Sequence, residues 1–187
     1  MDTKEKIIDS LIELASVKGL GKTSLNDIAG KVGINKASIY YYYPSKQKMI
    51  EDMYFLIRKK STSQLSIDTS IPLKSYFRNS FQSYLKLCTS TKMKKVFIII
   101  ESEKYMNKEA AELYIEESNH MVKTCENVLE KYAEDKKIII SNLPYAARSY
   151  AFYAHELIMR MILDNKDYRP EINSFLDGFM SIFIKEL

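Results

Sequence analysis

Cysteine and histidine are scarce in this chain of 187 residues, which contains two of each. Cys88 and Cys125 cannot build a disulfide framework, and we interpret both as small apolar core residues. Together with His120 and His155 they offer no convincing set of zinc ligands. The sequence therefore predicts a protein that binds neither a metal nor a cofactor.

Glycine and proline are also rare, with five and four residues. Such a composition, without repeats or low-complexity segments, is typical of a compact and mostly helical protein. No apolar run approaches the roughly 18 residues of a membrane span, and the acids near the N-terminus are unlike a signal peptide. We expect a soluble, cytoplasmic protein with no membrane partner.

Catalytic motifs are missing from the sequence as well. It has no nucleophile elbow, phosphate-binding glycine loop or HExxH motif, and no carboxylates paired at a recognisable spacing. An enzyme is therefore not expected.

The excess positive charge lies in the N-terminal third. Residues 1–60 contain 11 Lys and Arg against 7 Asp and Glu, whereas residues 61–187 contain 17 of each. Between Lys18 and Lys48, six lysines stand against one acid, Asp27. A charged surface is often only solvated, but this asymmetry favours a polyanionic partner for the N-terminal part.

Apolar residues at helical spacing run through the whole chain and predict an all-α fold of about nine helices. The polar stretch Lys59–Ser70 is the best candidate for a domain boundary, so we expect domains at 1–60 and 61–187. Residues 136–140 have the pattern of a strand, but an isolated strand would lack a partner. We expect the last helix to run from Glu171 to the C-terminus.

Capping residues define the N-terminal helices. Gly19 ends the first helix, and Ser24 starts a short second one with a capping box that Asp27 completes. Asn35 caps a third helix, which Pro44 ends after two turns. The residues expected to pack these short helices together are Ile28, Ala29, Val32, Gly33, Ile34, Ile39 and Tyr43. Ala29 and Gly33 are small where the two helices would cross.

Four consecutive tyrosines, Tyr40–Tyr43, occupy the third helix. They cannot all be buried, because successive side chains of a helix are about 100° apart. Tyr43 lies one turn from Ile39 and is expected in the core. Tyr40 and Tyr41 are left on the opposite side, where a binding role would explain them.

The pattern T-S-x-x-D-I-A-x-x-x-G-x-x-x-x-x-I-Y-Y-Y-Y-P-S-K, from Thr23 to Lys46, resembles the N-terminal helix-turn-helix of the TetR family of bacterial transcriptional regulators. The resemblance covers roughly residues 4–56. Tyr42 stands where that family often has His, and Tyr43 where Phe is commonest. The resemblance implies an N-terminal DNA-binding domain and a C-terminal helical domain for ligand binding and dimerisation.

The third helix would then enter the major groove of DNA. Lys36, Ala37 and Ser38 are its candidates for base contacts, since Ala37 can touch a thymine methyl and Lys36 a guanine or a phosphate. The candidates for the DNA backbone lie around them: Ser24, Asn26, Tyr40, Tyr41, Tyr42 and Lys46. A cation in the first turn of a helix opposes the helix dipole, so we interpret Lys46 as a phosphate contact.

The resemblance also implies a homodimer, formed through the last two helices of each chain, that reads a two-fold symmetric operator. The candidate interface residues are Ala147, Ala151, Ala154, Ile158, Phe175, Phe179 and Phe183. A packing role inside one chain is the alternative for each.

A pocket for a small apolar or amphipathic effector is implied as well, although Met and aromatic residues at helical spacing are more often core. Its candidate lining residues are Tyr84, Phe97, Met121, Tyr150, His155 and Met159. The function expected is a repressor released from its operator by this effector. The alternatives are control by a protein partner, no effector at all, or a helical ligand-binding or scaffold protein that has lost DNA binding.

Overall fold

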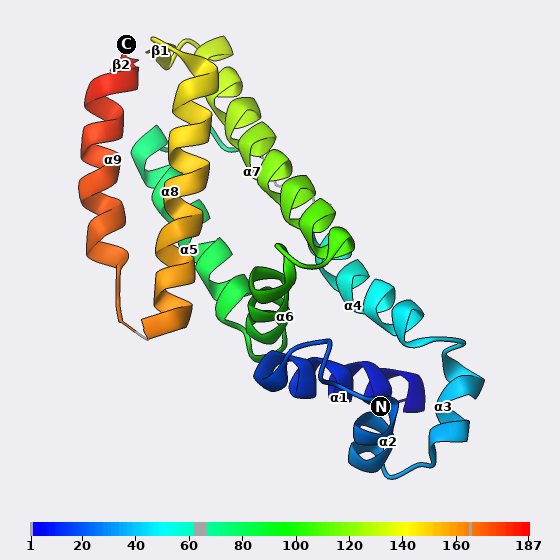
Figure 1. The fold of residues 1–187 in the computed structure, drawn as a ribbon. Coiled ribbons are helices and arrows are strands. Elements are labelled where there is room, and N and C mark those ends of the chain that lie inside the picture. Colours follow the sequence, from blue (N-terminus) through cyan, green and yellow to red (C-terminus); the bar gives the residue numbers. More distant parts are fainter. Residues whose placement is uncertain (1, 62–66, 165) are drawn as a thin grey trace. The chain divides into compact units, whose positions relative to one another are not determined.

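The computed structural model describes residues 2–61, 67–164 and 166–187, and only the backbone of residues 57–61 (Figure 1). Within these ranges the fold is all-α, with nine helices and one two-stranded sheet, as the sequence predicts. The chain divides into two compact units. The first comprises Met1–Ser63 with Ser90–Ile115, and the second Gln64–Thr89 with Glu116–Leu187.

The first unit contains α1 (Thr3–Lys18), α2 (Leu25–Val32), α3 (Lys36–Tyr42), α4 (Lys46–Ser61), α6 (Thr91–Glu103) and the first turns of α7 (Lys108–Glu134). The second unit contains α5 (Leu73–Thr89), the rest of α7, β1 (Ile138–Ile140), α8 (Leu143–Asp164), α9 (Arg169–Phe183) and β2 (Ile184–Glu186).

The predicted caps of α1, α2 and α3 are all present. Gly19 ends α1 at φ 83°, and Ser24 and Asp27 form the capping box of α2. Gly33 ends α2 in the left-handed region at φ 80°. A Cβ on Gly33 would meet no atom within 4 Å, so its backbone conformation, not a close helix crossing, calls for glycine. Asn35 Oδ1 accepts the Ser38 N–H at 2.8 Å and so caps α3.

The core of the first unit joins α1 to α2, α4 and α6. Ile28 and Ile39 are fully buried, and Ala29 and Tyr43 nearly so. Val32 and Ile34 are only half-buried. Much of the predicted boundary stretch Lys59–Ser70 lies outside the residues whose side chains the structure describes.

Residues 90–115 pack with the N-terminal helices, although they lie beyond the boundary expected near residue 60. The compact units therefore differ from a simple division of the chain in two. The functional division into residues 1–60 and 61–187 stays a prediction.

Aromatic side chains form the centre of the second unit. The rings of Phe77 and Tyr150 lie 4.1 Å apart, and the Tyr150 hydroxyl donates to the Phe77 carbonyl oxygen at 2.6 Å. Phe179 contacts both rings. Helices α5, α8 and α9 are thereby joined around one buried cluster.

The expectation of no strand at residues 136–140 is wrong. Ile138–Ile140 pairs antiparallel with Ile184–Glu186, with Ile139 opposite Lys185. The partner is the C-terminal segment, which was expected to be helical, and α9 ends at Phe183. A strand needs only one neighbour for its ladder, and here that neighbour comes from distant sequence.

Candidate nucleic-acid interface

The first turn of α3 carries the three residues that are predicted to contact bases. Lys36 and Ala37 are exposed, and Ser38 is half-buried. The Ser38 hydroxyl also donates to Asn35 Oδ1 at 3.0 Å, so the cap holds both the backbone and the side chain of this residue. A helix N-terminus presented in this way suits close approach to base edges.

The four tyrosines of α3 divide as their spacing predicts. Tyr43 is 2% exposed, whereas Tyr40 and Tyr41 are 50% and 86% exposed. Tyr42 is half-buried, and its ring packs edge-on against Tyr41 at 5.1 Å. Tyr42 therefore supports Tyr41, and its own contact with a phosphate stays a prediction.

Ion pairs within the fold neutralise several of the N-terminal lysines. Lys18 pairs with Asp27 at 2.8 Å and Lys31 with Glu13 at 2.7 Å. The hydrogen bond from Lys18, followed by those from Ser24, holds the pKa of the Asp27 carboxyl far below its usual range. These two lysines thus bring little net charge to a DNA surface.

Among the residues that the structure describes, exposed Lys22 and Lys36 have no ion-pair partner in this region. Lys22 lies in the loop before α2 and was missed as a site residue by sequence reasoning. Lys22 lies two residues before the Ser24 cap, and a helix N-terminus also attracts phosphate. This position could have marked Lys22 as a candidate for a phosphate contact.

The start of α2 carries the two remaining predicted backbone contacts. Ser24 accepts the Asp27 N–H at 3.1 Å, and its hydroxyl donates to Asp27 Oδ2 at 2.7 Å. This hydroxyl is therefore engaged as a cap. Asn26 is exposed.

Lys46 has a hydrogen-bond partner within the protein. Its ammonium donates to the Leu20 carbonyl oxygen, in the loop before α2, and the side chain is half-buried. Burial lowers the pKa of this ammonium, while the negative charge of Glu103 counteracts that effect. A partner inside the protein is an alternative explanation of a cation in the first turn of α4, and the phosphate contact of Lys46 stays a prediction.

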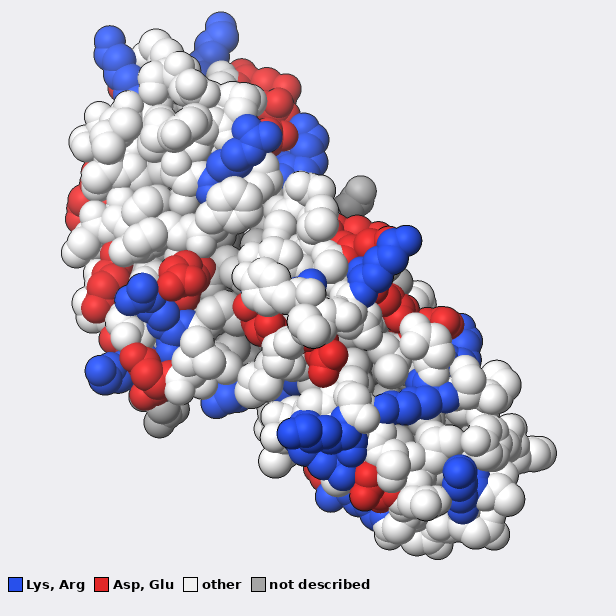
Figure 2. All heavy atoms as spheres, viewed as in Figure 1, with Lys and Arg blue, Asp and Glu red and all other residues white. Residues whose placement is uncertain are grey.

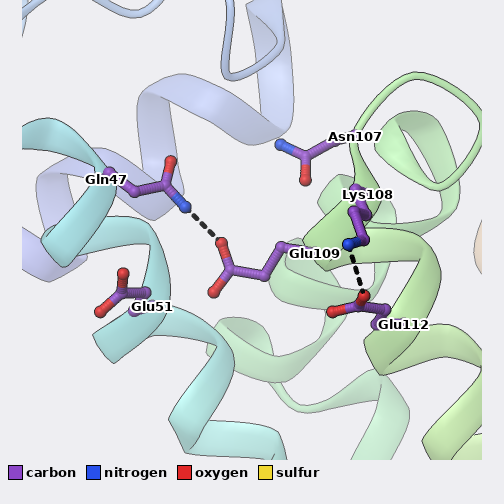
Figure 3. A pocket seen from close by; sticks show the side chains of 6 residues that line it. All are labelled: Gln47, Glu51, Asn107, Lys108, Glu109 and Glu112. Atoms are coloured by element: carbon purple, nitrogen blue, oxygen red, sulfur yellow. Dashed lines mark hydrogen bonds and ion pairs between the residues drawn. The ribbon is translucent and has the colours of Figure 1, made fainter.

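A shallow cavity of about 520 Å³ lies next to the same turn of α4 (Figure 3). Its lining is polar and comprises Gln47, Glu51, Asn107, Lys108, Glu109 and Glu112. Gln47 Nε2 donates to Glu109 Oε2 at 2.5 Å, and Lys108 lies 3.6 Å from Glu112. The cavity is thus crossed by a hydrogen bond that joins α4 to α7.

The residues predicted to line the effector pocket fall in both units, and the pocket stays a prediction. Phe97 belongs to the first unit, whereas Tyr84, Met121, Tyr150, His155 and Met159 belong to the second. Tyr150 and Met159 are buried, and Tyr150 is hydrogen-bonded within the aromatic core. The remaining polar feature is Tyr84, whose hydroxyl lies 3.4 Å from His155 Nδ1.

The predicted dimer interface also needs correction. Most of its residues are buried within the single chain: Ala147, Ala151, Ala154, Ile158 and Phe179. Their small or apolar side chains pack inside the second unit. Phe175 and Phe183 are half-buried.

Exposed apolar side chains nevertheless remain on α8 and α9. Tyr145, Phe152 and Ile182 are each at least half exposed. In Figure 2, the part of α8 and α9 near the C-terminus is largely uncharged, whereas charged side chains gather near the segment that connects these helices. No helix in the described ranges is long and apolar enough to cross a membrane.

Residues 7–53 match the sequence model of the family described as bacterial regulatory proteins, tetR family. A segment of 48 residues is 52% identical to the biofilm operon icaADBC negative transcriptional regulator IcaR of Staphylococcus aureus strain Newman, covering 26% of each chain. IcaR of Staphylococcus epidermidis is 50% identical over 46 residues, 25% of each chain. The matched segment thus spans about a quarter of these curated relatives.

Solved structures share the fold of the whole chain. Salmonella enterica GusR superposes with a TM-score of 0.73 at 14% identity, covering 96% of this chain and 95% of that one. NalD, the secondary repressor of the MexAB-OprM efflux pump in Pseudomonas aeruginosa, has a TM-score of 0.71 at 20% identity, covering 99% and 97%. The curated relatives are negative transcriptional regulators by name. The N-terminal segment of this chain is thus similar to the tetR family of bacterial regulatory proteins, and the whole chain shares the fold of the solved structures.

Proposed function

We propose that this protein is a transcriptional repressor that binds a two-fold symmetric DNA operator as a homodimer and is released by a small-molecule effector. The observation that carries the proposal is the exposed edge of α3. There an unpaired lysine, Lys36, stands beside the small residue Ala37 at a capped helix start, with exposed Tyr40 and Tyr41 one turn further on.

The residues of this edge have separate roles in the proposal. Lys36, Ala37 and Ser38 face base edges, where a short side chain permits close approach. Tyr40, Tyr41 and Lys22 contact phosphates on either side and fix the register without reading sequence. Asn26, exposed at the start of α2, adds a further backbone contact.

Repression is supported by the relatives, since IcaR is a negative regulator and NalD a repressor by name. A homodimer is supported by the exposed apolar residues of α8 and α9. One recognition helix offers few contacts, and two copies double the DNA interface. A self-complementary surface with Phe152 on α8 and Ile182 on α9 would provide the contact.

The effector would bind in the second unit and shift the protein toward a state with lower operator affinity. The pair of Tyr84 and His155 supplies the polar groups that a site for an amphipathic molecule needs.

Selection of genomic fragments by the purified dimer at several salt concentrations tests the proposal. We expect one enriched two-fold symmetric sequence, bound far more tightly than unrelated DNA, with affinity that falls as salt rises. Failure to enrich any sequence would favour the alternative of a helical ligand-binding or scaffold protein that has lost DNA binding. Tight binding that no candidate small molecule weakens would instead favour a protein partner, or no effector.

A further inference from the structure

Two carboxylates at the ends of the α6–α7 turn hold consecutive residues of α4. Gln47 donates directly to Glu109 at 2.5 Å (Figure 3). Lys46 is held through one backbone residue: it donates to the Leu20 carbonyl oxygen, and the Leu20 N–H donates to Glu103 Oε1 at 3.0 Å. All five residues belong to the first unit.

The position of Glu103 is not explained by the stability of its own helix. It is the last residue of α6, where the helix dipole disfavours an acid. Its carboxylate instead lies against the loop between α1 and α2, where a Cβ on Gly19 would be 3.5 Å from Oε1. The carboxylate thus serves a distant segment of the chain.

The first turn of α4 is also coupled to the recognition helix by a short connection. Only residues 43–45 separate α3 from α4. Tyr43 is buried beneath Lys4, whose ammonium lies 5.0 Å from the ring centre. A shift of Lys46 and Gln47 must therefore move the C-terminal end of α3, because three residues with a buried anchor cannot absorb it.

We propose that Glu103 and Glu109 are positioning residues for DNA binding, which fix the first turn of α4 and thereby the orientation of α3. This inference rests on the proposed function. Lys46 acts in the same assembly, through Leu20, and does not contact a phosphate. The polar cavity of Figure 3 is the space across which Glu109 reaches α4.

Tyr54, two turns along α4, provides independent support. Its hydroxyl is buried and has no hydrogen-bond partner among the residues that the structure describes. Burial raises the pKa of this hydroxyl, and the charges of Glu103 and Glu109 raise it further, so both carboxylates lie within electrostatic reach.

Operator affinity of full-length Glu103→Ala and Glu103→Gln tests the proposal. Both changes remove the same negative charge, which by itself would strengthen binding to DNA. Only glutamine keeps an oxygen that accepts the Leu20 N–H. We expect Glu103→Ala to weaken binding about tenfold and Glu103→Gln to bind nearly as the wild type. Equal affinities of the two variants, or tighter binding by both, would overturn the proposal.

Glu109→Ala is expected to weaken operator binding, whereas Glu112→Ala is the matched control. Glu112 lines the same cavity but pairs with Lys108 and does not reach α4. Thermal unfolding of each variant separates lost orientation from lost folding. Weakened binding by Glu112→Ala to the same extent would show a general effect of charge at the cavity and contradict the positioning role.

Lys46→Ala separates the two roles of the lysine. A positioning residue lowers affinity without changing the slope of log K against log salt, whereas a lost phosphate contact reduces that slope by about one. In the Glu103→Ala background, Lys46→Ala should cost little more, since both act through Leu20. Additive losses or a reduced slope would refute the inference. Absence of DNA binding by the wild type would instead refute the proposed function.

Discussion

Charge pairing within the fold determines which lysines are available to a polyanion. The sequence shows six lysines between residues 18 and 48. Lys18, Lys31 and Lys48 are paired with acids, and Lys46 with a carbonyl group. Exposed Lys36 has no such partner among the described residues, so it should make the main electrostatic contribution of α3 to DNA binding.

Lys36→Ala is therefore expected to weaken operator binding and to reduce its salt slope by about one. Lys31→Ala removes the same charge from a lysine that is paired with Glu13, and should change the slope much less. Fluorescence anisotropy titrations over a range of salt concentrations measure both. Equal slopes for the two variants would show that pairing in the free protein does not govern DNA contact.

The two cysteines allow a prediction about pH. Burial raises the pKa of both thiols to about 12, above the roughly 8.5 of an unfolded cysteine. Their contribution to stability is full below the unfolded pKa and is lost as pH rises toward 12. At pH 8 the native protein should leave a thiol reagent unreacted, and both thiols should react in denaturant. Reaction of the native protein faster than it unfolds would contradict this burial.

At the scale of elements, short-range signals and long-range pairing differ in what they predict. The caps at Ser24 and Asn35 require residues only three positions away, and both are present as the sequence indicates. The strand Ile138–Ile140 depends on a partner 44 to 48 residues later, and only folding brings that partner into place.

Gly33→Ala tests the left-handed end of α2. The change places a Cβ on a residue at φ 80°, and should destabilise the protein by about 1 kcal/mol. Gly30→Ala is the matched control, because Gly30 lies inside α2 with open space around its Cβ and should gain about 0.5 kcal/mol or more. Denaturant unfolding measures both. The interpretation fails if the two variants shift stability in the same direction.

For the whole molecule, assembly depends on which apolar residues remain exposed after the chain has folded. Ala147, Ala151 and Ala154 lie on one face of α8. Their spacing is equally compatible with helix packing within a chain and between chains. In the structure these alanines are buried, while Phe152 and Ile182 remain at the surface.

Phe152→Glu is accordingly expected to convert the dimer into monomers and to weaken operator binding, because a charge would have to be buried at the interface. Sedimentation velocity measures the change. Tyr105→Glu, at a more exposed aromatic residue of the first unit, should leave the dimer intact. A Phe152→Glu variant that remains dimeric would place the interface elsewhere.

The sequence by itself determined the first three helices, their caps, the division of the tyrosine run and the resemblance of the N-terminal segment to the TetR family. These features depend on residues within one or two turns of each other, so their spacing is visible along the chain. Tertiary structure alone decided which lysines are neutralised, that Leu20 joins Lys46 to Glu103, and which residues of α8 stay exposed. Each of these depends on contacts between segments distant in sequence, which no local pattern records.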